Sequence, residues 1–345
     1  MKFTPKSLAR TAAVALCVAG ALSFTSCRHS GGRVLEVAYV SGIQVNLRDR
    51  VAAVFEKAGT VKNGDRVEVL DRDRRFAKVR TATGQMGWME QRYLVSQDVY
   101  DQLQKLTADN ANDPVQAQGV TRNDTNLHVE PGRDTEHLYQ ISAGEKLSLL
   151  KRGTAEKPGS GAPPPRSQGA KSGEKKAPVP IIEDWWLVRD SHARVGWVLS
   201  RMVDLDVPLD IAQYAEGQRI VAFFVLDQVT DGDRKVPQYL CVVTEPKDGL
   251  PFDFSQIRVF TWNVKRHRYE TAYRERMEGV LPVTVAQENF DKEGVLPVFV
   301  IHVRDDDGKT SERKYKLNTP MVRRVYAPGE EPQKVVRKRS PRSRH

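Results

Sequence analysis

Cys27 is the residue of this chain whose position most directly suggests a chemical role. It follows a basic start at residues 1–10, an apolar stretch of small residues over 11–23 and a short passage that leads into the cysteine. A charged start, an apolar middle and a small-residue end are typical of a secretory signal peptide. The apolar stretch is too short to span a bilayer, which takes roughly 20 residues. We therefore expect residues 1–26 to be a signal peptide, with the Cys27 thiol at its end.

This ending resembles the lipobox of bacterial lipoproteins, with Phe24 at the position three residues before the cysteine where leucine is usual. The resemblance implies that the Cys27 thiol is acylated and becomes the mature N-terminus. The protein would then be lipid-anchored in the cell envelope, at the periplasmic face of a membrane, rather than threaded through it. Arg28 stands where some bacteria place the aspartate that retains lipoproteins at the inner membrane, which favours the outer membrane. The alternative is an ordinary secretory signal with an incidental cysteine.

The other residue types that could catalyse a reaction are scattered along the chain. Cys241 lies in the apolar run 239–243, which predicts a buried and inert thiol. A thiol hydrolase needs a histidine within reach of its thiolate, and His267 and His302 lie in strand-like segments without a supporting motif. Residues 305–308, Asp-Asp-Asp-Gly, lack the ligand spacing of a calcium loop and predict a hairpin turn. We therefore expect no catalytic residue, no metal site and no cofactor.

Two segments of the chain repeat the same pattern. Asn46-Leu47-Arg48 recurs as Asn126-Leu127-His128, 80 residues later, and Gly87-Trp88-Met89 recurs as Gly196-Trp197-Val198, 109 residues later. The two offsets differ by 29 residues, which indicates an insertion in the second copy. Residues 152–180 are rich in Pro, Gly, Ser and Lys and have no apolar periodicity. We expect this segment to be a flexible loop.

Each copy predicts a series of short strands, because apolar and polar residues alternate between glycine-containing turns. The order of motifs in the first copy is Asn-Leu-Arg, Gly-Asp-x-Val-x-Val-Leu, then Gly-Trp-Met before Tyr93-Leu94. This order resembles the bacterial SH3-like domain, a module that often accompanies cell-wall hydrolases. The resemblance implies two small barrels, at residues 37–95 and 118–205. His128 replaces Arg48 in the second copy, which weakens the expectation of ligand binding there.

Tryptophans offer a candidate binding surface. Trp88 and Trp197 each follow a glycine on a closing strand, and either fill the barrel cores or form a shallow platform for a peptide or glycan. Trp185 and Trp186 are adjacent in a strand and must face opposite sides. Because Trp185 aligns with Phe76, we assign Trp185 to the core and Trp186 to the surface. The candidate ligand-binding residues are Trp186, Trp88 and Trp197.

The remaining segments complete the organisation of the chain. Residues 27–36 predict a linker, and residues 96–117 a linker helix with apolar side chains at i, i+4 and i+7 that would pack between the barrels. Residues 208–326 stay rich in predicted strands but resemble neither copy, nor any family that we recognise. The predicted fold class is mainly β: two small SH3-like barrels followed by a β-rich sandwich or barrel domain.

Positive charge is concentrated at the ends of the sequence. The chain has 345 residues and a net charge of +10, yet residues 1–26 and 334–345 contain basic residues and no acidic ones. The body between them is close to neutral, which disfavours nucleic acid as a partner, since nucleic-acid binding usually needs a basic face on the fold. We expect residues 327–345 to form a disordered basic tail, able to contact anionic lipid or wall polymer.

These patterns together predict a non-enzymatic cell-envelope lipoprotein that acts as a binding or scaffolding module. Its expected partners are a membrane, through the lipid anchor, and either peptidoglycan or an envelope protein. The alternative is a cell-wall hydrolase, or a hydrolase accessory, with an unrecognised catalytic domain. A third possibility is a subunit of a larger envelope assembly in which the barrels only hold partners.

Overall fold

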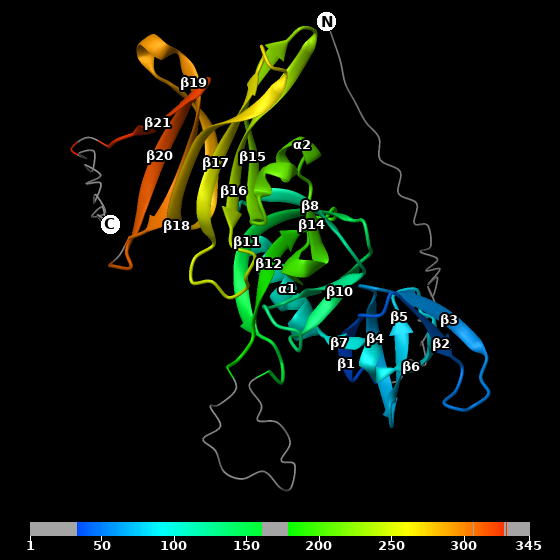
Figure 1. Ribbon diagram of the computed structural model, residues 1–345. Helices are drawn as coiled ribbons and strands as arrows, with labels where there is room; N and C mark the ends of the chain where they lie inside the picture. Colours follow the sequence, from blue (N-terminus) through cyan, green and yellow to red (C-terminus); the bar gives the residue numbers. More distant parts are fainter. Residues whose placement is uncertain (1–32, 161–178, 306, 328, 330–345) are drawn as a thin grey trace, which may run out of the picture.

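The computed structural model describes residues 33–160, 179–305, 307–327 and 329. Three seven-stranded antiparallel sheets follow one another along the chain (Figure 1). The predicted fold class, mainly β with an SH3-like unit followed by further β-rich units, is confirmed. Cys27 and nearly all of the predicted basic tail lie outside the described residues. Within the described residues, no helix is long and apolar enough to cross a membrane.

The first sheet curls into a small unit, the first barrel, with strand order β3-β2-β6-β5-β4-β1-β7. Successive side chains of a strand point to opposite faces, so Leu47, Val69 and Val79 face inward and form its core. A single 3-10 turn, η1 (Gln91–Tyr93), leads into the last strand. The strands are β1 (Glu36–Val40), β2 (Gln44–Arg48), β3 (Lys57–Lys62), β4 (Arg66–Asp73), β5 (Phe76–Thr81), β6 (Met86–Glu90) and β7 (Leu94–Ser96).

The second sheet, the second barrel, repeats this arrangement strand for strand. Its order is β10-β9-β13-β12-β11-β8-β14, in which each strand takes the place of its counterpart in the first barrel. The repeat in the sequence is therefore also a structural repeat, and η2 (Ser200–Met202) corresponds to η1. The strands are β8 (Ala117–Thr121), β9 (Thr125–His128), β10 (His137–Ile141), β11 (Lys146–Glu156), β12 (Ile182–Arg189), β13 (Val195–Leu199) and β14 (Val203–Leu205).

The prediction of a flexible loop over residues 152–180 is wrong for its first five residues, 152–156. Strand β11 continues to Glu156, and residues 152–156 pair with residues 182–186 of β12. The side of this hairpin is packed, because a Cβ atom added to Gly153 would lie 2.7 Å from the Trp197 ring. Residues 161–178 lie outside the described residues.

The predicted linker helix, α1 (Gln97–Asp109), joins the two barrels. Val99 and Leu103 on one face of the helix are buried in the core that it shares with the second barrel, which confirms its predicted packing role. Tyr100 stacks on Tyr39 of the first barrel with ring centroids 4.1 Å apart. The side chain of Asn63 adds two hydrogen bonds across the barrel junction, to main-chain groups of β10. The barrels therefore contact each other directly as well as through the helix.

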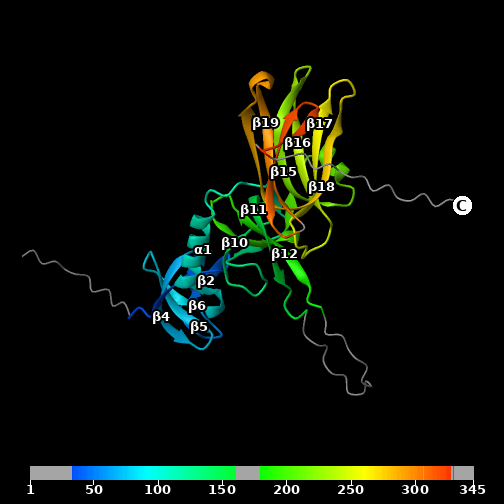
Figure 2. The same ribbon diagram turned by 90° about the vertical axis from the view of Figure 1, so that its left-hand side faces the viewer.

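The third sheet is a meander whose strands are neighbours in sequence order. At Gly279, β18 changes its pairing partner from β17 to β19, and the ring of Phe254 approaches so closely that a Cβ atom there would lie 2.1 Å from it. The two layers pack face to face as an open sandwich (Figure 2), which agrees with the predicted sandwich or barrel. The elements are α2 (Leu209–Ala212), η3 (Gln213–Ala215), β15 (Arg219–Asp231), β16 (Arg234–Thr244), β17 (Phe254–Asn263), β18 (Arg268–Asn289), η4 (Asp291–Glu293), β19 (Val295–Arg304), β20 (Thr310–Asn318) and β21 (Met321–Val325).

A buried ionic network joins the second barrel to the third sheet. The carboxylate of Asp184 accepts hydrogen bonds from Arg152 at 2.7 Å, from Arg219, and from the main-chain N–H of Gly249 at 3.0 Å. Arg152 also donates to Asp253 and to two main-chain carbonyl oxygens of the same loop. The side chains of Arg152 and Asp184 are 5% and 2% exposed. Burial by itself would raise the pKa of Asp184, but the hydrogen bonds from Arg152 and Gly249, with the nearby charges, hold that pKa below its ordinary value.

The predicted orientation of the tryptophan pair in β12 is wrong. Trp186 is 4% exposed and belongs with Val188 to the main core, whereas Trp185 lies on the opposite, outer face of the barrel and is buried there. The alignment of Trp185 with Phe76 holds, but Phe76 also faces outward, beneath the guanidinium of Arg48. Alternation along a strand assigns opposite faces correctly, but it does not reveal that neighbouring segments cover the outer face.

The ionic network predicts a strong stability effect. We expect Asp184→Ala to lower the free energy of unfolding by about 3–5 kcal/mol, because it removes the buried carboxylate shared by Arg152 and Arg219 and leaves the buried Arg152 guanidinium with only Asp253 as its counter-charge. In the wild type, the contribution of this carboxylate is fully present above its ordinary pKa of 3.8 and is lost as the pH falls through the lower, native pKa. Denaturant unfolding at neutral and acidic pH measures both effects. The matched control is Asp204→Ala, which breaks the exposed Arg122–Asp204 pair and should change little.

Both tryptophans of β12 should be needed for stability. We expect Trp186→Ala and Trp185→Ala each to cost roughly 3–5 kcal/mol, because each leaves a large cavity in a packed region. Thermal unfolding of the two variants measures this directly. A Trp186→Ala variant that melts like the wild type would contradict the buried position of that ring.

Candidate ligand-binding face

The outer face of the first barrel holds a cluster of cationic and aromatic side chains, the first-barrel face, made by Arg48, Phe55, Phe76, Trp88 and Glu90. The guanidinium of Arg48 lies 4.0 Å from the ring centroid of Phe55 and 5.0 Å from that of Phe76. Trp88 pairs with Arg48 across β6 and β2 and is half-buried. The carboxylate of Glu90 lies 3.9 Å from Arg48. Cation–π contacts of this kind hold a guanidinium in place while leaving part of it accessible.

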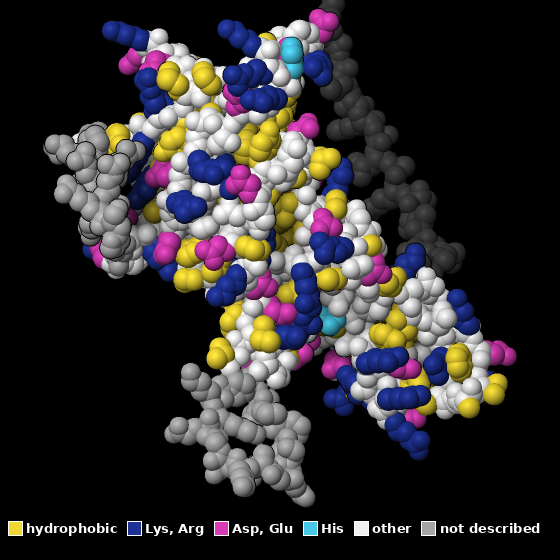
Figure 3. Space-filling model, in the orientation of Figure 1, with side chains coloured by type: hydrophobic (Ala, Val, Ile, Leu, Met, Phe, Trp, Pro, Cys, Tyr) yellow, Lys and Arg dark blue, Asp and Glu magenta, His cyan; other side chains and the backbone are white. Residues whose placement is uncertain are grey.

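Strand alternation explains why these residues share a face. Leu47 points into the core, so Arg48 points outward, and Ala77 points inward, so Phe76 points outward. Gly87 lets β6 approach β2, because a Cβ atom there would lie 2.7 Å from the Cβ of Leu47. Figure 3 shows basic side chains beside apolar ones over this barrel. The face can offer a guanidinium to an anionic group and aromatic surface to an apolar or sugar ring.

The second barrel has residues at the positions equivalent to Arg48 and Trp88, but the surroundings of these residues differ. His128 replaces Arg48 and pairs across the strands with Trp197, as Arg48 does with Trp88. Its ring is buried, packs edge-on against Trp185 with centroids 5.3 Å apart, and lies 5.0 Å from His137. Burial, and then the neighbouring His137, lower the pKa of His128 to about 4. At neutral pH the His128 ring is therefore uncharged, and little of it is exposed.

The predicted binding tryptophans thus have three different environments. Trp88 lies half-buried beside Arg48 on the first-barrel face. Trp197 is half-buried too, but it packs with Leu187 and Val195 in a small cluster covered by α1 and by Gly153. Trp186 is in the core and contributes no surface. Phe55 and Arg48 were not among the predicted binding residues, although the Asn-Leu-Arg motif contains the arginine and its replacement by His128 already weakened the expectation of binding in the second copy.

The candidate nucleophile Cys241 is buried, and burial raises the pKa of its thiol to about 12. Its sulfur is therefore protonated at neutral pH and unsuited to attack. His267 contacts the carboxylate of Asp231 at 2.8 Å, and His302 contacts the main-chain oxygen of Pro282 at 2.9 Å. Both histidines therefore have partners other than the thiol.

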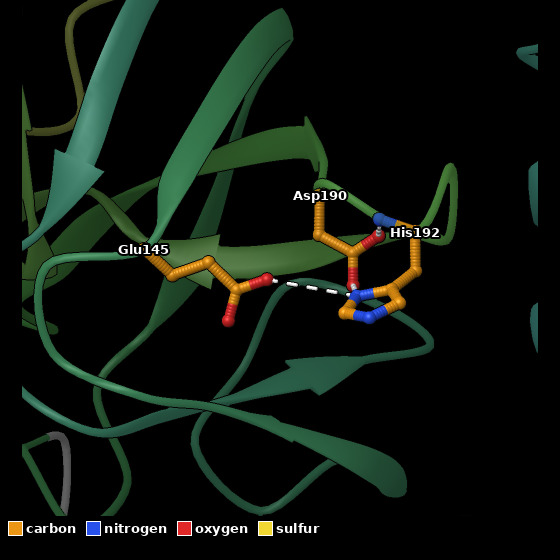
Figure 4. A group of neighbouring side chains, drawn as sticks. All are labelled: Glu145, Asp190 and His192. Carbon is orange, nitrogen blue, oxygen red and sulfur yellow. Dashed lines mark hydrogen bonds and ion pairs between the residues drawn. The ribbon is translucent and has the colours of Figure 1, made fainter.

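Glu145, Asp190 and His192 place three metal-ligating atoms within 4.8 Å of one another (Figure 4). The Asp190 carboxylate is already used: it accepts hydrogen bonds from the main-chain N–H groups of His192 and Arg194, at 2.9 and 2.8 Å. The guanidinium of Arg194 donates to its second oxygen at 2.6 Å. A cation thus already neutralises this carboxylate, and the group closes the turn between β12 and β13. We assign it to the turn rather than to a metal.

Most of the chain aligns with three solved structures: an NlpC/P60 family protein from Bacillus cereus, and NlpC2 and NlpC1 from Trichomonas vaginalis. The sequence identities are 12%, 9% and 10%, and the TM-scores are 0.22, 0.16 and 0.17. The alignments cover 83%, 84% and 82% of this chain and 95%, 95% and 88% of the other chains, respectively.

These TM-scores do not establish a shared overall fold. The comparison with curated proteins gives no match. Residues 44–95 match the family model of the bacterial SH3 domain, and this segment contains the whole of the first-barrel face. The chain therefore contains a bacterial SH3 domain at residues 44–95.

Proposed function

We propose that this protein is a non-enzymatic cell-envelope lipoprotein that binds peptidoglycan through its first-barrel face. The observation that carries the proposal is the Arg48 guanidinium, held between the rings of Phe55 and Phe76 within the bacterial SH3 domain. Because aromatic contacts already restrict this side chain, less conformational entropy is lost when it binds a ligand. The protonated, buried Cys241 thiol favours a binding role over thiol-dependent hydrolysis.

The chemistry of peptidoglycan suits this face. Its peptide stems carry carboxylates, which a guanidinium binds with charge-assisted hydrogen bonds. Its sugars and peptides present apolar surface that can lie against Trp88 and the exposed edge of Phe55. Glu90 lies close enough to Arg48 to orient it, but 3.9 Å is long for a hydrogen bond, so the guanidinium keeps donors for a ligand.

We further propose that the second barrel is a diverged copy of the same domain with a scaffolding role. In the proposed division of labour, the first barrel binds, and the second connects it to the third sheet. The neutral, buried His128 and the buried Trp185 support this assignment, because neither can offer a charge or an exposed ring to a ligand.

Lipid attachment at Cys27 completes the proposal. An acylated Cys27 would hold the chain at the periplasmic face of a membrane, with the outer membrane as the favoured location. Since residues 33 onward lead directly into β1, the anchor would keep the first barrel close to the membrane surface.

The binding proposal predicts a specific loss. We expect Arg48→Ala to weaken co-sedimentation with purified sacculi by about tenfold or more, since charge-assisted hydrogen bonds are worth about 1.5–3 kcal/mol. The barrel should remain folded, because Arg48 lies outside the apolar core of the barrel. The measurement is the bound fraction against sacculus concentration.

The matched control is Arg66→Ala, which removes the same charge from the same barrel beside Glu68, away from the first-barrel face. Equal binding by wild type and Arg48→Ala would contradict the assignment of the face. Solubilisation of sacculi by the purified protein would contradict the non-enzymatic role and favour the hydrolase alternative.

Replacing the sulfur atom of Cys27 tests the anchoring proposal. Only a thiol can accept the diacylglycerol, so Cys27→Ser should abolish lipidation and block cleavage by the lipoprotein-specific peptidase. Stable anchoring takes two acyl chains or a second signal, so the wild type should partition into the detergent phase and the variant should not. Normal maturation of Cys27→Ser, with a wild type that is soluble without detergent, would refute the anchor.

A further inference from the structure

The third sheet has one open side, where two strand edges face each other. β15 is the first strand of the sheet and pairs only with β16. The second half of β18, residues 284–289, pairs only with β19. Unpaired main-chain groups on such edges must be satisfied by water, by side chains or by another chain.

Gln116 closes the lower part of this open side. Its main-chain oxygen accepts the N–H of Phe223 on the β15 edge at 2.8 Å. Its side-chain amide binds the other edge: Oε1 accepts the N–H of Val283 at 2.8 Å, and Nε2 donates to the oxygen of Val283 at 3.3 Å. Gln116 is fully buried and is tied to the second barrel through Leu149. Gln116 thus already fills one part of the space between the two edges, and its main chain pairs with β15 there.

Above Gln116 the space between the edges continues as a groove of about 420 Å³. Among the described residues, one hydrogen bond crosses this groove, and it is long: the side-chain amide of Gln287 donates to the main-chain oxygen of Leu226 at 3.5 Å. Val225 is 52% exposed although it lies in the sheet. Farther up, the β15–β16 and β18–β19 hairpins diverge (Figure 1). The groove is lined by Val225, Leu226, Asp227, Gln228, Thr230, Lys235 and Gln287.

The chemistry of this groove fits an extended peptide. A free strand edge presents main-chain donors and acceptors at a spacing that another extended backbone matches. The exposed Val225 offers an apolar contact, and the amides of Gln228 and Gln287 offer further hydrogen bonds. Asp227 and Lys235 have opposite charges, so the groove has no net charge to select a polyanion.

We propose that an extended segment of a partner protein adds as a strand to the upper edge of β15, continuing the position that Gln116 occupies below. The segment is held by main-chain hydrogen bonds and places an apolar side chain over Val225. This interaction is independent of the first-barrel face and goes beyond peptidoglycan binding.

The probe is a phage-displayed library of random ten-residue peptides, selected on the purified full-length protein. The strongest sequence is then synthesised as a free peptide, and its affinity is measured by fluorescence anisotropy. We expect bound peptide to slow amide hydrogen exchange in residues 225–230. Val225→Lys should weaken binding at least tenfold, and the same peptide N-methylated at alternate residues should not bind, because it lacks the main-chain donors.

The matched control is Val295→Lys, which adds the same charge at another valine, 66% exposed and outside the groove. This variant should bind as the wild type does, and so should Arg48→Ala, which separates this proposal from the first-barrel proposal. The proposal is overturned if no peptide is selected, if exchange slows elsewhere, or if Val225→Lys or the N-methylated peptide binds normally. A wild-type dimer that Val225→Lys dissociates would also overturn it, because the occupant would then be a second copy of this chain.

Discussion

A buried carboxylate, Asp184, determines how the third sheet meets the second barrel. A charge removed from water must be compensated by partners at defined positions, and here those partners come from both sides of the junction: Arg152 from the barrel, and Arg219 and the Gly249 N–H from the third sheet. An apolar junction can slide by small steps, whereas sliding this one would break the hydrogen bonds that Arg152, Arg219 and the Gly249 N–H donate to the Asp184 carboxylate. The junction thus resists the relative motion that is otherwise expected between domains.

The two barrels show how one fold can carry different chemistry. Their strand orders and their glycines at 87 and 196 are equivalent, so the backbone presents the same positions in both. In the first barrel, the arginine at 48 remains partly accessible between aromatic rings. In the second, the histidine at 128 lies in a buried aromatic setting, where desolvation disfavours its charged form. A fold match therefore does not transfer function from one copy to the other, because the chemistry depends on what covers the outer face.

Several features of the fold could be predicted because they depend on local pattern. The two sequence offsets identified the repeat, alternation identified the strands, and apolar spacing identified the face of α1. The orientation of Trp186 and the start of the loop at residue 152 could not be predicted, because both depend on contacts from distant parts of the chain. Arg152 looked like the first residue of a flexible insertion, yet its partner Asp253 lies about a hundred residues away in sequence. Likewise, nothing local marks Gln116 as the residue that would bridge two strand edges.

The position of Gln116 links the junction to the open edge of β15. Gln116 belongs to the short segment that leads from α1 into β8, and it pairs with Phe223, two residues before the first residue that lines the groove. The position of β15 against the barrel therefore determines where the unpaired part of its edge begins. The first-barrel face and this edge lie at opposite ends of the molecule in both ribbon views (Figures 1 and 2). They also differ in physical principle, since one depends on a side-chain charge and the other on main-chain groups. If both proposals hold, a partner at one end would not compete for the groups at the other, which is the property that a scaffold between two ligands requires.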